Sequence, residues 1–306
     1  YASCADIGVN CIGGVANDGT TLSTFNLNVQ NGTTYYLVIS TWATPQTTAY
    51  TLNISKVCPA GVWVGTTSNF NTASNWADNM VPEACTAVTV NVAAPMTISS
   101  DVTVASIALG ATAVVTVGST GVLNVGTISV ATGGNLTINS DGVVLQSSTA
   151  ANTAVATVKR NSTPLFRQDY KIWSSPVTGQ NLRAFSTQTL FNRFSSYNTA
   201  TNAYTQEIVT VADMDAKTFT SAKGYLIRMP NDWVELPSSN PAQPYSGSFT
   251  GTLNNGTITI PLLNETVDPG TPRKLNLVGN PYPSPISIAA FFAANTASPL
   301  VSTLAD

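Results

Sequence analysis

The chain has 306 residues, of which 43% are hydrophobic and only 9% are charged, and its formal net charge is −3. The hydrophobic share argues against a disordered chain, and the lack of any Lys/Arg cluster larger than two residues argues against nucleic-acid binding. No apolar run approaches the roughly 20 residues of a membrane-spanning helix. Thr, Ser and Asn take the place of surface charges, which is typical of extracellular β-proteins.

The four cysteines all lie in the first 85 residues, at Cys4, Cys11, Cys58 and Cys85. Their number is even, their spacing is not C-x-x-C, and the chain contains no histidine that could complete a zinc site. We therefore expect two disulfides formed in an oxidising compartment. Four cysteines allow three pairings, and the connectivity stays open. We favour Cys4–Cys11 and Cys58–Cys85 because neighbours in sequence close the smaller loops.

Residues 1–57 read as short β-strands that form a β-sandwich, which we expect to be incomplete. In STFNLNV, alternation places Phe25, Leu27 and Val29 on one face, and in AYTLNIS it does the same for Tyr50, Leu52 and Ile54. The segments TYYLVISTW and AYTLNIS resemble the closing strands of bacterial pre-peptidase C-terminal-type domains, small β-sandwiches of secreted peptidases.

Residues 58–95 hold Trp63 and Trp76 in a segment otherwise rich in Asn, Thr, Ser and Ala. If a repetitive β-structure follows, its first coil has an open apolar end and an unpaired strand edge, and two large rings can cover them. The alternative is an exposed platform on which sugar rings stack. The W-x-G…N-W…P pattern here resembles an element that introduces repetitive β-regions in secreted proteins of Bacteroidota.

Residues 96–160 carry a repeat of 21 residues. Val102, Val104, Ile107 and Leu109 align with Leu123, Val125, Ile128 and Val130, and Val115–Val117 align with Leu136–Ile138, always at this offset. Three short strands per period, with glycines between them, predict a three-sided β-solenoid whose alternate apolar side chains point inward and stack. An ordinary β-sandwich is the alternative, but it requires no shared register.

Residues 161–306 are richer in aromatic residues and lose the 21-residue register. The motifs WSSPVTG (173–179), GYLIR (224–228) and GNPYPS (279–284) follow in order. This series resembles a β-domain of Bacteroidota cell-surface proteins exported by the type IX secretion system, and it implies a β-sandwich-like domain. Asn254-Asn255-Gly256 predicts a tight hairpin turn, and ISIAAFFAAN (286–295) predicts the one short helix.

Catalytic chemistry finds little support in the sequence. The absence of histidine removes Ser-His-Asp and Cys-His catalysis, and the remaining acid pairs, such as Asp213 with Asp215 and Asp232 with Glu235, lie in polar, loop-like stretches. We therefore expect no enzyme, no catalytic residue and no resident cofactor. Calcium is the most credible ion, with candidate loops at Asp18, Asp141 and Asp268, although each is equally a plain turn.

The sequence therefore predicts an all-β protein: a partial β-sandwich, a capped β-solenoid with coils of about 21 residues, and a β-sandwich-like domain. Its expected role is that of a non-enzymatic, extracellular structural or adhesive segment of a large bacterial surface protein, and one form of that role is assembly into a surface filament. The expected partners are other copies or domains of the same assembly. The alternative is a carbohydrate-binding accessory region of a secreted polysaccharide-degrading enzyme, with polysaccharide as the partner.

Overall fold

The computed structural model describes residues 13–15, 24–25, 27, 29, 33–39, 49–236, 239–263 and 275–294. The chain divides into two units, residues 1–57 and 58–306, and each is described by itself. In the first unit, no described residue belongs to a strand, and side chains such as Phe25, Val29 and Tyr50 are exposed. The predicted β-sandwich over residues 1–57 therefore stays a prediction.

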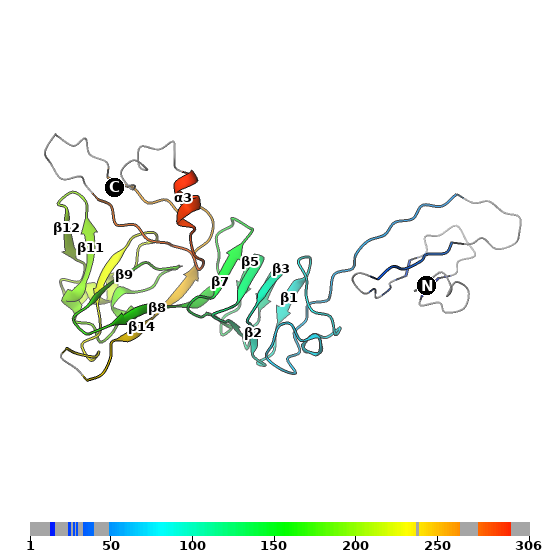
Figure 1. The fold of residues 1–306 in the computed structure, drawn as a ribbon, viewed down its shortest axis with the longest axis horizontal. Coiled ribbons are helices and arrows are strands. Elements are labelled where there is room, and N and C mark those ends of the chain that lie inside the picture. Colours follow the sequence, from blue (N-terminus) through cyan, green and yellow to red (C-terminus); the bar gives the residue numbers. More distant parts are fainter. Residues whose placement is uncertain are drawn as a thin grey trace, which may run out of the picture. The chain divides into compact units, whose positions relative to one another are not determined.

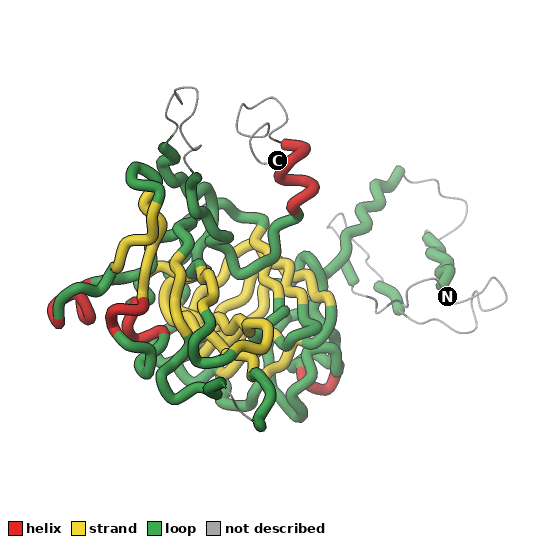
Figure 2. The backbone as a smooth tube through the Cα atoms, turned by 60° about the vertical axis from the view of Figure 1, so that its left-hand side comes forward, coloured by secondary structure: helices red, strands yellow, loops and turns green. Residues whose placement is uncertain are grey.

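The second unit is built mostly of strands, with a few short helices between them (Figures 1 and 2). Its elements in chain order are η2 (Ala73–Asn75), β1 (Ala87–Val90), β2 (Met96–Ile98), β3 (Asp101–Leu109), β4 (Val114–Val117), β5 (Val122–Val130), β6 (Asn135–Ile138), β7 (Val143–Gln146), β8 (Val155–Leu165), β9 (Tyr170–Trp173), β10 (Val177–Thr178), α1 (Leu182–Phe185), η3 (Phe191–Arg193), β11 (Phe194–Asn198), β12 (Ala203–Gln206), α2 (Val211–Ala216), β13 (Tyr225–Arg228), β14 (Gln243–Leu253) and α3 (Ile288–Ala294). This confirms the predicted all-β class.

A β-solenoid of about three turns forms the first part of this unit. Strands β1, β3, β5 and β7 pair in parallel in one sheet, and β2, β4, β6 and β8 pair in parallel in a second. Val102 lies beside Leu123, Leu109 beside Val130 and Val115 beside Leu136. The 21-residue register read from the sequence is therefore confirmed.

The long strands β3 and β5 turn a corner at their middle, which gives each coil three inward-facing stretches. In β3, Val104 and Ile107 both point inward, and the two residues between them, Ala105 and Ser106, do not. Gly126 occupies the same corner of the next coil, where a β-carbon would overlap the carbonyl oxygen of Ala105. The close approach of two coils at this corner therefore requires a glycine.

The solenoid core consists of the predicted apolar stack. The members predicted from the second coil are fully buried except Val130, which is half-buried against the core: Leu123, Val125, Ile128, Val130, Leu136 and Ile138. The first coil begins at Ala87, earlier than the predicted boundary at residue 96, because β1 also belongs to it. Ala87 pairs with Ser106 and Met96 with Val115, offsets of 106 − 87 = 19 and 115 − 96 = 19 residues. The shorter first coil places these strands outside the 21-residue register.

Strand β8 joins the solenoid to the C-terminal domain. It pairs in parallel with β6 and, along most of its length, antiparallel with β14, which in turn pairs with β10. An outward row of threonines crosses these strands at register positions Thr97, Thr116, Thr137, Thr157 and Thr250. The second sheet of the solenoid therefore continues into the C-terminal domain, where β14 covers the edge of β8.

The C-terminal domain adds an antiparallel sheet with the strand order β12-β11-β13-β9. Its core is aromatic: Trp173, Phe185, Phe219 and Phe249 are buried, and the rings of Phe185 and Phe249 stack with centroids 4.6 Å apart. The described residues form three short α-helices, α1, α2 and α3, whereas the sequence predicts only α3. Among the described residues, no helix combines the length and the apolar character needed to cross a bilayer.

The predicted hairpin after Leu253 is wrong. Strand β14 ends at Leu253, and no strand is assigned to the described residues 254–263. Asn255 instead donates from Nδ2 to the carbonyl oxygens of Ser148 and Ala150, both at 2.7 Å. These long-range bonds direct the chain toward the solenoid and away from a return along β14.

Candidate functional site

Trp63, Phe70 and Trp76 form an aromatic cluster at the N-terminal end of the solenoid. The Trp63 and Trp76 rings meet edge to face with centroids 5.0 Å apart, and the Phe70 and Trp76 rings do so at 4.9 Å. Each of the three side chains is only 1% exposed. The cluster is therefore part of the core.

Hydrogen bonds fix the two indoles in place. Trp63 Nε1 donates to the carbonyl oxygen of Ala94 at 3.0 Å, and Trp76 Nε1 donates to that of Phe70 at 2.8 Å. Neither ring presents a free face to solvent, as a sugar-stacking platform requires. Their burial supports the cap interpretation.

Asn75 organises the loop that carries the cluster, a role that sequence reasoning missed. Its side chain is fully buried. Thr66 Oγ1 and Thr67 N donate to Asn75 Oδ1 at 2.8 and 2.6 Å, and Asn75 Nδ2 donates to Thr67 Oγ1 and the Asn69 carbonyl oxygen at 2.8 and 2.6 Å. All the hydrogen-bonding capacity of the amide is used within the cap. The Asn75-Trp76 pair of the W-x-G…N-W…P element was the only sequence signal for this role, and it did not show which groups the Asn75 amide would bond.

The cap pairs with two strands of the first coil, β1 and β2. Val62 forms a parallel bridge to Thr89 of β1, and Asn69 forms one to Thr97 of β2. Both strands belong to the first coil, which ends where Ser106 comes to lie beside Ala87 and which also holds Val102 and Val104, so the cap lies against the coil that the sequence predicts. These bridges satisfy backbone groups that would otherwise template pairing with other chains.

A disulfide between Cys58 and Cys85 closes the cap segment, as the sequence predicts, with a Cα–Cα distance of 5.8 Å. Cys58 is the first residue of the second unit, and Cys85 lies two residues before β1. The predicted Cys4–Cys11 disulfide lies outside the described residues.

The Asp141 candidate calcium loop has the geometry of a tight turn. Asp141 adopts a left-handed backbone conformation with φ of 68°, and Gly142 N donates to the Asn139 carbonyl oxygen at 3.0 Å. The carboxylate interacts with Arg160, whose guanidinium also donates to Asn139 O at 3.3 Å. Burial lowers the pKa of Arg160, and the nearby Asp141 opposes this effect. The charge of Arg160 therefore lies near the Asp141 carboxylate.

The other metal and acid candidates do not converge on one site. Asp18 and Asp268 lie outside the described residues. Within the described part of the chain, no three acidic, cysteine or histidine side chains gather where they could hold a metal ion. Asp213 belongs to the capping box of α2, whose N-cap residue is Thr210: its carboxylate accepts from the backbone N–H groups of Thr210 and Val209, which hold its pKa below the usual value.

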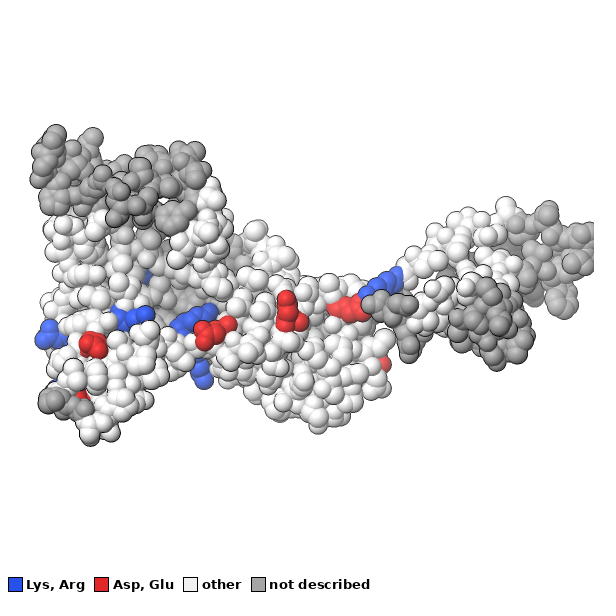
Figure 3. Space-filling model, viewed as in Figure 1, with Lys and Arg blue, Asp and Glu red and all other residues white. Residues whose placement is uncertain are grey.

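A shallow groove of about 320 Å³ runs along the outside of the solenoid. Its lining includes the outward row Thr103, Asn124 and Leu145 and the small corner residues Ala105 and Gly126. Asn124 Nδ2 already donates to Asp101 Oδ1 at 2.7 Å. Charged side chains are sparse on the face shown in Figure 3, where most lie along one line. The groove offers small polar and apolar groups to a ligand but no aromatic face.

The C-terminal motifs meet at Asn254, which is 7% exposed. Its Oδ1 accepts from Thr178 Oγ1 at 2.7 Å, and its Nδ2 donates to the Pro281 carbonyl oxygen at 2.8 Å. WSSPVTG and GNPYPS are therefore joined through one buried amide.

In the same domain, Glu207 accepts from Lys223 Nζ at 2.9 Å. Burial acts to raise the pKa of Glu207, but hydrogen bonds and the Lys223 charge together lower it.

The fold is that of a disulfide-closed β-solenoid with an aromatic N-terminal cap and an antiparallel β-domain at its other end. Residues 62–304 match a domain of unknown function, DUF8693, and because this is more than half of the chain, the protein belongs to that family. Searches of curated proteins and of solved structures found no match. The family match begins at Val62, where the cap first pairs with β1, so the cap, solenoid and C-terminal domain form one family unit.

Proposed function

We propose that this chain is a non-enzymatic structural or adhesive segment of a bacterial cell-surface protein, in which the solenoid serves as a rigid spacer. The observation that carries this proposal is the closure of the solenoid within the chain. Trp63, Phe70 and Trp76 close one end, and the β8–β14 pair continues the sheet at the other. The aromatic residues that stand out in the sequence therefore stabilise the solenoid, which supports a structural role for them.

Closure also limits how copies can assemble. The edges of β1 and β2 are bridged by the cap, so a second solenoid cannot pair with these two strands at that end. If the protein forms a surface filament, we expect the copies to associate through side-chain surfaces or through parts of the protein beyond the solenoid.

An extracellular location is supported by the Cys58–Cys85 disulfide, since reducing compartments disfavour such bonds. The low charge and the Ser/Thr/Asn-rich surface agree with it. Export by the type IX system in a member of Bacteroidota is the specific form we propose, on the resemblance of WSSPVTG, GYLIR and GNPYPS. The carbohydrate-binding alternative lacks its expected platform, because both cap tryptophans are buried.

Protease treatment of intact cells that carry the parent protein tests this proposal. We expect peptides from residues 58–306 to be released without lysis, and mass spectrometry without reductant to find Cys58 linked to Cys85. A cytoplasmic protein that stays unreleased is the control. Recovery only after lysis, with both thiols free, would contradict the surface assignment.

A further inference from the structure

Arg228, the last residue of β13, is buried without an acidic partner. It is 7% exposed, and its guanidinium donates only to neutral amide oxygens: Nη1 to Gln168 Oε1 at 3.5 Å and Nη2 to Asn231 Oδ1 at 3.2 Å. Neither ion pair found among the described residues includes Arg228. A buried cation normally has an anionic partner, because burial removes the water that solvates it.

A second guanidinium lies next to the first. Arg167 Nη1 donates to the Asn231 carbonyl oxygen at 3.4 Å, so Asn231 bridges both arginines, and Arg167 also pairs with Glu235. The Nε atoms of both arginines are buried and have no hydrogen-bond partner. They are two of only four such side-chain atoms in the described part of the chain. Unpaired buried donors at one place indicate a missing acceptor.

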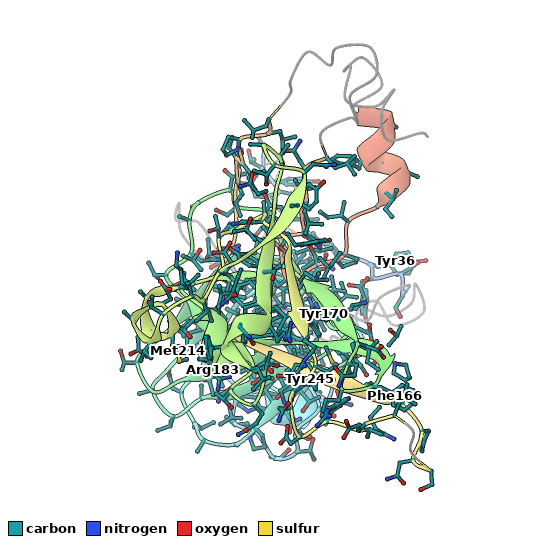
Figure 4. The ribbon with its side chains drawn as sticks, turned by 90° about the vertical axis from the view of Figure 1, so that its left-hand side faces the viewer. Tyr36, Phe166, Tyr170, Arg183, Met214 and Tyr245 are labelled. Carbon is teal, nitrogen blue, oxygen red and sulfur yellow. A yellow bond between two sulfur atoms is a disulfide. The ribbon has the colours of Figure 1, made fainter. Side chains whose placement is uncertain are left out.

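The side chains that surround the Arg228 guanidinium are themselves exposed to solvent. The side chains of Gln168 and Asn231 both lie at the surface. Tyr170, directly opposite Arg228 in the β9–β13 register, is 39% exposed, so both side chains project from the same face of the sheet. Phe166 and Tyr170, which bracket this loop, are labelled in Figure 4.

The loops that carry these groups are held in place by backbone bonds. Arg167 N donates to the Val234 carbonyl oxygen at 2.6 Å, and Met229 N donates to that of Asp169 at 3.0 Å. Phe166 N donates to Asp169 Oδ2 at 2.7 Å. A ligand can therefore reach Arg228 by displacing two exposed amides, while the surrounding backbone stays fixed.

We propose that Arg228 binds the carboxylate of an acidic saccharide, a hexuronate unit. The planar guanidinium fork matches a carboxylate with two parallel hydrogen bonds. The displaced amides of Gln168 and Asn231 can then bond sugar hydroxyls, since each has donors and an acceptor, and the Tyr170 ring offers an apolar face. Asp232, which is exposed, and Glu235 lie close by and would repel a densely charged ligand, which favours a single carboxylate per site over a polyphosphate. The site extends the adhesive role and does not depend on the spacer proposal.

Titration of the oxidised full chain with oligogalacturonate and with the neutral galactose oligomer, at equal ionic strength, tests the site. We expect the uronate to bind at least about tenfold more tightly than the neutral oligomer, as the loss of a charge-assisted pair predicts. Arg228→Met should lose at least about tenfold in uronate affinity. Gln168→Glu should lose as much while remaining folded, because it supplies the carboxylate internally. This second variant keeps the test decisive if Arg228→Met fails to fold.

Arg160→Met is the matched control. Arg160 is half-buried and donates from Nη1 to the carbonyl oxygens of Asn139 and Lys159, at 3.3 and 2.8 Å, so its loss should leave uronate binding unchanged. Equal binding of both oligomers, no binding of either, or full uronate binding by Gln168→Glu would overturn the proposal. A glutamate-containing peptide that binds when the uronate does not would refute the saccharide as the ligand. Failure in any of these leaves the cell-surface test above unaffected.

Discussion

Replacing Trp76 by alanine tests the aromatic cap. A buried tryptophan removes roughly 200 Å² from water, which at about 25 cal/mol/Å² corresponds to about 5 kcal/mol. The unfolded chain already buries part of this surface, and the cavity left behind adds a cost, so we expect a loss of about 3–5 kcal/mol. The variant also leaves the Phe70 carbonyl oxygen without its indole donor.

Thermal and denaturant unfolding of the oxidised protein measures this effect. For a unit of this size, such a loss lowers the melting temperature by about 10 °C. Phe191→Ala is the control, since Phe191 is 41% exposed and should change the free energy of unfolding by less than about 1 kcal/mol. A Trp76→Ala protein that melts like the parent would refute the reasoning that these rings close the solenoid.

Three further predictions concern the solenoid core, the disulfide and the C-terminal domain. Leu123→Asp places a carboxylate in the apolar stack and should cost several kcal/mol, whereas Ser129→Asp on the exposed face of the same strand should cost little. Circular-dichroism melts compare the two variants, and equal stabilities would show that the register is wrong. Cys58→Ser with Cys85→Ser should lower stability by about 2–4 kcal/mol, and a parent whose melting temperature does not respond to reductant would contradict this. Glu207→Gln should lower the free energy of unfolding by about 1 kcal/mol at pH 7. Because the pKa of Glu207 is lower in the folded state, its ionised carboxylate stabilises the fold fully above the unfolded-state pKa of about 4.3. This stabilisation is lost as the pH falls through the folded-state pKa. Denaturant midpoints of both proteins between pH 3 and 7 should therefore converge at low pH, and a constant difference would count against the pair.

The solenoid was predictable because one physical requirement repeats along the sequence. Each coil must place apolar side chains over those of the last, so Val102 and Leu123, or Val115 and Leu136, recur at the same offset. Strands β1 and β2 of the first coil fell outside the detected repeat because they pair with the next coil at an offset of 19 residues. A period search finds only coils that share one length.

The polar parts of the fold were not predictable in the same way. Asn254-Asn255-Gly256 has the composition of a hairpin turn, but its amides bond partners that are distant in sequence. Helix α2 did have a local signal, since Thr210 and Asp213 form a capping box. Arg228 looked like an ordinary strand residue, because its missing acidic partner is a property of the folded structure alone.

Disulfide trapping across the solenoid tests its register most directly. Thr116 and Thr137 are outward register partners on adjacent parallel strands, so their Cα atoms lie about 4.8 Å apart, within the range that a disulfide bridges. Thr157 is the next partner of Thr137 and therefore lies about 9–10 Å from Thr116, which is too far. The account predicts an oxidised cross-link in Thr116→Cys/Thr137→Cys and none in Thr116→Cys/Thr157→Cys, read by peptide mapping without reductant. No cross-link in the first pair, or an equal yield in the second, would contradict the β-solenoid.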